Sequence, residues 1–124
     1  MSDVFPVVLG ICLDAEALWT SKVEPGAHRP ILMSHGAYAI HEGLEPLLGL
    51  LLRRTVRATF FVPGVTAERY PEAVRRISDA GHEIASHGYA HLPVTALDRE
   101  AERNELLGGI DALEAVTGTR PTAW

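Results

Sequence analysis

The sequence is short of cysteine and of positive charge, and each shortage excludes a class of protein. Its one cysteine, Cys12, cannot form an internal disulfide, so the fold does not depend on oxidative cross-linking. Lys and Arg number 11 against 16 Asp and Glu, a formal net charge of −5. This balance argues against nucleic-acid and anionic-membrane partners, since both attract concentrated positive charge.

Long hydrophobic runs are also missing. No segment approaches the roughly 20 apolar residues that span a bilayer. Residues 1–6 carry no positive charge, and the apolar stretch around Pro6 is too short for a signal peptide. We therefore expect that stretch to be a strand and the protein to be cytoplasmic. The remaining composition, 47% hydrophobic and 22% charged over 124 residues, is that of a single globular domain spanning residues 1–124.

Hydrophobic periodicity predicts strands that alternate with helices. Continuous apolar or β-branched runs predict strands, and apolar spacings of three and four predict amphipathic helices. The expected order is strand 7–13, helix 44–54, strand 56–62, helix 71–80, strand 82–86, helix 95–117 and a partial strand 121–124.

Details of these runs refine the prediction. The strand at 7–13 is apolar throughout, as in a strand buried on both faces, which makes Cys12 an inert buried hydrophobe. Residues 14–41 lack periodicity and read as a long functional loop. The pair Gly108-Gly109 inside a helix indicates a close packing contact. The alternation predicts an α/β fold with a parallel sheet and right-handed crossovers, open or curling toward a barrel.

Candidate reactive residues follow the predicted strands, where parallel α/β folds gather their chemistry. Asp14 and Glu16 follow the first strand, Pro63-Gly64 the second, and residues 86–91 the third. Four residues separate His87 from His91, which on one helical turn points both imidazoles the same way. Two imidazoles with a carboxylate such as Asp14 form an open zinc-type site. The alternative is two structural histidines bonded to backbone.

Six segments, in order along nearly the whole chain, resemble the polysaccharide deacetylase family, the NodB-homology or carbohydrate esterase 4 type. They resemble more narrowly the branch of peptidoglycan deacetylase-like enzymes and cyclic imide or ureide hydrolases. The segments are residues 14–19 (DAEALW), 34–38 (SHGAY), 57–64 (RATFFVPG), 67–71 (AERYP), 79–84 (DAGHEI) and 86–91 (SHGYAH).

The resemblance implies a distorted seven-stranded (β/α) barrel that hydrolyses an amide, typically an N-acetyl group on a sugar. It implies a divalent metal, zinc by preference, held by Asp14, His87 and His91, which agrees with the interpretation from strand ends. The expected substrate is a glycan or small-molecule N-acyl compound. In this framework His35 lies in a substrate-side loop, and Trp19 forms a wall against the sugar or serves in packing.

The sequence departs from the family in two respects. Relatives carry an aspartate two residues before the metal aspartate as general base, and that position here is Cys12. We favour Asp14 as the ligand, with Glu16 as the remaining catalytic carboxylate; the alternative register makes Asp14 the base and Glu16 the ligand.

Family members are also about twice as long. We therefore expect the N-terminal half of a barrel, truncated before the later catalytic motifs and impaired in activity. Two alternatives stay open: a non-catalytic remnant that forms a homo-oligomer, and a cytosolic cyclic imide or ureide hydrolase.

Overall fold

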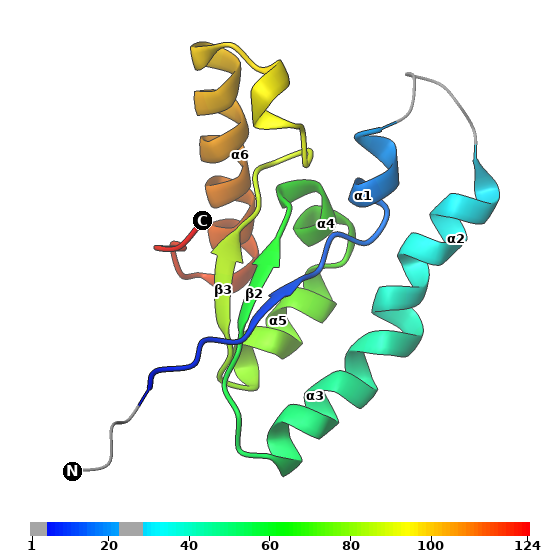
Figure 1. Cartoon of the computed structure of the whole chain (residues 1–124), viewed down its shortest axis with the longest axis vertical. Coiled ribbons are helices and arrows are strands. Elements are labelled where there is room, and N and C mark those ends of the chain that lie inside the picture. The colour runs from blue at the N-terminus through cyan, green and yellow to red at the C-terminus, as the bar shows by residue number, and fades with distance from the viewer. Residues whose placement is uncertain (1–4, 23–28) are drawn as a thin grey trace.

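The computed structural model describes residues 5–22 and 29–124, and a three-stranded parallel sheet lies at its centre (Figure 1). The sheet order is β1-β2-β3, so each strand pairs with the next one along the chain. The strands are β1 (Gly10–Cys12), β2 (Thr59–Val62) and β3 (Glu83–Ser86). The predicted alternation of strands and helices and the parallel sheet are thereby confirmed, and the segments that follow the strands lie at one edge.

Helices connect the strands. They are α1 (Ala17–Thr20), α2 (Pro30–Tyr38), a π-helical turn (Ala39–Gly43), α3 (Leu44–Arg53), α4 (Gly64–Arg69), α5 (Pro71–Asp79), a 3₁₀ turn (Val94–Ala96) and α6 (Arg99–Thr117). In Figure 1, α2 and α3 run on from one another along one side of the molecule. Among the described helices, none is both long and apolar enough to cross a bilayer.

The prediction of a loop over residues 14–41 is wrong for its second half, where α2 forms. Pro30 occupies the first helical position, which suits its fixed φ and missing N–H. The apolar residues of α2 do not form one stripe: Ile31 is exposed, while Leu32 and Met33 are half-buried. The periodicity that reveals an amphipathic helix is therefore weak here. Residues 23–28 of the same stretch lie outside the described residues.

The first strand is shorter and more exposed than predicted. Only Gly10–Cys12 pairs in the sheet, and Val7 and Val8 are 90% and 82% exposed. The strand lies at the sheet edge, so it has a neighbour on one side only. The prediction of burial on both faces is wrong because one face alone packs against helices.

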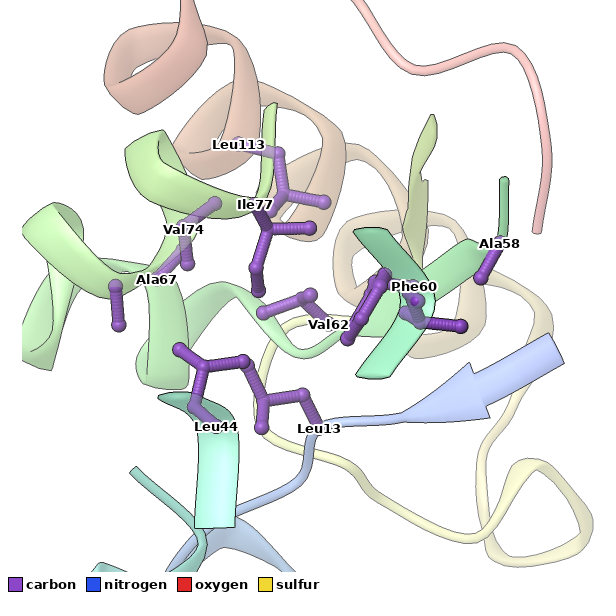
Figure 2. Close-up of a cluster of buried hydrophobic side chains, with 11 residues drawn as sticks. Leu13, Leu44, Ala58, Phe60, Val62, Ala67, Val74, Ile77 and Leu113 are labelled. Carbon is purple, nitrogen blue, oxygen red and sulfur yellow. The ribbon is translucent and has the colours of Figure 1, made fainter. Parts of the chain in front are cut away.

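That packed face carries the hydrophobic core (Figure 2). Alternate strand residues point to it, as the two-residue period of a strand requires. Phe60 and Val62 of β2 are fully buried, and helix residues such as Ile77 and Leu113 close over them. Each such side chain stabilises the fold by about 1.5–3 kcal/mol through burial. The core thus fixes the sheet beneath the segments that follow its strands.

The helix ends follow the sequence closely, with local exceptions. Helix α6 begins after the predicted residue 95: Asp98 is its N-cap and accepts a hydrogen bond from the Ala101 amide at 2.8 Å. Gly118 ends α6 at φ 72°. Leu52, near the end of α3, and Ala80, just past the end of α5, are exposed.

The C-terminal segment returns to the sheet beside β3 (Figure 1). The Ser86 amide donates to the Ala123 carbonyl at 2.9 Å. Residues 121–124 do not form the predicted partial strand, and this one hydrogen bond joins them to the end of β3. Helix α4 was not predicted, because its six residues begin at Gly64 directly after Pro63, and Pro-Gly is a pair typical of a turn.

Candidate functional site

One carboxylate and two imidazoles meet beyond the ends of β1 and β3. His87 Nε2 lies 3.6 Å from Asp14 Oδ1, and His91 Nε2 lies 3.7 Å from Asp14 Oδ2. The two rings are 4.9 Å apart between centroids. Each carboxylate oxygen therefore faces a different imidazole nitrogen, and the structure brings together the three residues that the sequence analysis grouped.

The histidines converge through a turn, and the prediction of a helical turn between them is wrong. Gly88 and His91 have φ values of 75° and 60°, in the left-handed region. Glu105 of α6 holds this turn, because its Oε1 accepts from the Ala90 and Leu92 amides at 2.7 and 3.1 Å. The left-handed backbone at Gly88 and His91, and the hydrogen bonds to Glu105, 14 residues beyond His91, thus orient the two imidazole rings.

Close backbone contacts clamp the histidine turn from the other side. The Gly64 amide, at the start of α4, donates to the Gly88 carbonyl at 3.0 Å. Gly109 of α6 lies against the same carbonyl: a Cβ added there would stand 2.3 Å from Gly88 O. The close contact predicted for Gly108-Gly109 is confirmed at Gly109, and it falls directly on the histidine turn.

A second glycine supports the segment that carries Asp14. Gly36 of α2 packs so tightly that an added Cβ would stand 2.7 Å from the Glu16 backbone. Thr66 donates its hydroxyl to the Asp14 carbonyl at 2.8 Å, and Ala15 has a φ of 49°. The backbone around Asp14 is thus held by contacts from α2 and α4.

The charges of the cluster suit a cation. Burial lowers the pKa of His87, His91 lowers it further, and Asp14 opposes both effects, so the net direction is down and the imidazole is neutral near pH 7. Neutral imidazole is the metal-binding form. Asp14 Oδ1 is buried with no hydrogen-bond partner in the described part of the chain. A buried anionic oxygen without a donor fits a site for a divalent ion.

Outside this cluster, Ser21 contacts the second histidine. Its Oγ lies 3.3 Å from His91 Nδ1, which leaves Nε2 free to face Asp14. A hydrogen bond at the far ring nitrogen fixes the tautomer and orientation of a metal-ligating histidine. The sequence analysis did not identify Ser21, since nothing in its spacing relates it to residue 91.

Cys12 belongs to the same cluster. Its thiol, a carboxylate oxygen of Asp14 and a ring nitrogen of His87 all lie within 4.8 Å of one another. Cys12 is exposed, so the prediction that it is buried is wrong. Partial burial and then the Asp14 carboxylate raise the pKa of its thiol. Cys12 ends β1 and Asp14 stands two residues later in the chain, a spacing that was present in the sequence.

Glu16 faces a different set of partners. Its side chain is buried, the Tyr70 hydroxyl donates to Oε1 at 2.5 Å, and Arg69 Nη2 lies 3.4 Å away. Burial and the bond to Glu16 raise the pKa of Tyr70. Arg69 and Tyr70 lie within the AERYP segment, but the sequence assigned them no role. More than 50 residues separate them from Glu16, so no local pattern predicts the contact.

A cavity of about 430 Å³ opens beside the two histidines. It lies between the histidine turn, the first half of α6 and the C-terminal residues. Its lining is mainly apolar: Leu92, Pro93, Val94, Leu97, Leu106 and Trp124, with Glu102, Glu105, Ser21 and Lys22 among the polar residues. Trp19 is half-buried on α1 and His35 is exposed on α2, and neither lines this cavity. Their predicted substrate contacts stay predictions.

The sheet and the cluster at its strand ends define an α/β protein of the partial barrel class. The profile of the polysaccharide deacetylase family matches residues 34–124, so the chain belongs to the polysaccharide deacetylase family. The family resemblance and the fold class predicted from sequence are confirmed.

Similarity to individual proteins extends over nearly the whole chain. A peptidoglycan deacetylase of Helicobacter pylori is 34% identical over 124 residues, which are 100% of this chain and 42% of that protein. A Mycobacterium smegmatis structure assigned to the polysaccharide deacetylases is 45% identical with a TM-score of 0.86, over 92% of this chain and 40% of that one. The structure of PuuE allantoinase is 25% identical with a TM-score of 0.81, over 92% and 43%. The chain thus spans about two fifths of these relatives.

Proposed function

We propose that this chain supplies the metal-binding edge of a hydrolase that cleaves non-peptide C–N bonds of the N-acetyl amide type. The observation that carries the proposal is the convergence of both His Nε2 atoms on the two oxygens of Asp14, at 3.6 and 3.7 Å. The similarity to a protein named peptidoglycan deacetylase supports an N-acyl glycan or small molecule as the substrate.

Asp14, His87 and His91 would hold the metal, with zinc as the preferred ion for one carboxylate and two imidazoles. When bound, such an ion lowers the pKa of a water ligand and polarises a substrate carbonyl. The chain's own residues prepare this site: Asp14 supplies the compensating charge, Ser21 orients His91, and burial keeps His87 neutral.

The contacts of Glu16 bear on the two registers left open by the sequence. Its carboxylate is occupied by Tyr70 and Arg69, while Asp14 faces both imidazoles. These contacts favour Asp14 as the ligand and a positioning role for Glu16. Because Glu16 directly follows the strained Ala15, anchoring its side chain holds the Asp14 segment against the junction of α4 and α5.

Calorimetric titration with Zn²⁺ tests the metal site. We expect His87→Ala and His91→Ala to abolish binding, because each removes one of three ligands. His41→Ala is the matched control, since His41 is an exposed histidine outside the cluster, and it is expected to bind zinc as the wild type does. Zinc binding that survives both single variants would refute the assignment.

A second substrate class follows from the similarity to PuuE allantoinase, which favours a cyclic ureide or imide. Both classes present a carbonyl bonded to nitrogen, so the same ligands serve either. Acetate release from N-acetylglucosamine oligomers, measured beside ring opening of allantoin, separates the two. The cytoplasmic location expected from the sequence stays a prediction.

A further inference from the structure

We propose that Cys12 is a fourth protein ligand of the cation held by Asp14, His87 and His91. The inference rests on the proposed metal site and adds one donor to it. Cys12 is the last residue of β1, and Asp14 follows two residues later. Successive side chains of an extended segment alternate between faces, so residues 12 and 14 project to the same side.

The donor distances given by the structure, among Cys12, Asp14 and His87 and between Asp14 and His91, approach those of four-coordinate zinc. With bonds of about 2.0 Å to nitrogen and oxygen and about 2.3 Å to sulfur, a tetrahedral site places its donor atoms roughly 3.3–3.8 Å apart. The Asp14 oxygens already lie 3.6 and 3.7 Å from the two imidazole nitrogens. The Cys12 thiol lies within 4.8 Å of its Asp14 and His87 partners, so a rotation or shift of about 1 Å brings it into range.

The orphaned oxygen of Asp14 makes the cluster more than a chance grouping. Asp14 Oδ1 is buried without a hydrogen-bond donor among the described residues, and it is the oxygen nearest His87. An uncompensated buried carboxylate oxygen is costly, and a cation between it and the thiol removes that cost. Coordination takes the thiolate form, so Cys12 releases its proton to bulk water on binding.

A fourth protein donor changes what the site does. Catalytic zinc sites keep three protein ligands and leave one position for water or substrate, whereas structural sites are closed by four. With Cys12 bound, the position that water would take is filled. The site then retains its ion strongly, and hydrolysis requires Cys12 to leave.

Titration with Co²⁺ tests the ligand set without reference to activity. Thiolate coordination to Co²⁺ gives a near-ultraviolet charge-transfer band, whereas oxygen and nitrogen donors alone do not. We expect this band in the wild type and its loss in Cys12→Ser, with Co²⁺ still bound by the other three ligands. Affinity should fall by at least about tenfold, the lower bound for losing even a partner that orients a ligand.

Thiol labelling gives an independent readout that needs no variant of Cys12. Because Cys12 is the only cysteine, a maleimide or iodoacetamide reports on that residue alone. Zinc should slow the labelling of the wild type and leave the rate in His87→Ala unchanged. A thermal melt of each variant verifies that it is folded before it is compared.

The outcomes separate this inference from the proposed function. If Co²⁺ binds in a manner that depends on His87 but shows no charge-transfer band, and zinc does not protect the thiol, Cys12 is not a ligand and the three-residue site stands. If the wild type binds neither ion, both proposals fail. A band that disappears in Cys12→Ser, together with zinc protection, establishes the four-ligand site.

Discussion

Replacing Gly109 with alanine should destabilise the protein and displace the histidine turn. The helix α6 passes so close to that turn that a Cβ at residue 109 would stand 2.3 Å from Gly88 O, 2.6 Å from Gly88 C and 2.9 Å from Ser86 Oγ. Two of these atoms are backbone. They cannot rotate away as the tip of a long side chain can.

The expected magnitude follows from two opposed terms. Inserting a methyl group into a packed interior costs about 1–3 kcal/mol, and a clash with backbone belongs at the upper end. Alanine in place of glycine inside a helix returns about 1 kcal/mol. The free energy of unfolding should therefore fall by about 2 kcal/mol, which for a domain of this size lowers the melting temperature by roughly 6–10 °C.

Gly49→Ala is the matched control, because it is the same substitution in the interior of another helix. The nearest atom to its added Cβ is Arg53 Nη1 at 3.2 Å, the end of a flexible side chain. This variant should gain up to about 1 kcal/mol. Urea unfolding of the two variants measures the difference. If Gly109→Ala were as stable as Gly49→Ala, and bound zinc as the wild type does, the close approach of α6 to the histidine turn would be refuted.

Two further predictions concern the N-cap of α6 and the hydrogen bond from Tyr70 to the buried Glu16. Asp98→Ala should lower the free energy of unfolding by about 1 kcal/mol because it removes the acceptor for the Ala101 amide. Asp98→Asn keeps an acceptor oxygen and should retain most of the wild-type stability. Equal urea midpoints for the two variants would contradict the cap. Tyr70 has a raised pKa, so above about pH 10 the unfolded chain releases this proton before the folded one does, and stability falls as pH rises through that range. Tyr70→Phe should make the urea midpoint fall less steeply with pH between 8 and 11 than it does in the wild type, and an unchanged slope would show that Tyr70 is not held protonated by the fold.

Much of the fold is predictable from sequence because its signals are local. The stripe that includes Leu44 and Leu51 identifies α3, and Val74 with Ile77 identifies α5, since helices bury one face against the sheet. The failures have local causes too. Helix α2 has apolar residues on several faces, and α4 is too short to show a period.

The site was predictable in part. Asp14 and the two histidines follow strands of one parallel sheet, and parallel strands bring their ends to one edge. The contacts of Glu16 and Ser21 were not predictable, because their partners lie more than 50 residues away along the chain.

The order of the three strands and of the longer amphipathic helices α3, α5 and α6, and the residues that follow the strands, can therefore be predicted from the sequence, because periodicity records which face of each element is buried. The direction of each side chain at the site is decided by tertiary structure alone. Left-handed backbone at Ala15 and His91, and the close approach of α6 at Gly109, depend on contacts between distant segments. These contacts turn Asp14 toward the imidazoles and Glu16 away from them. The sequence alone does not show which of these two carboxylates faces the histidines.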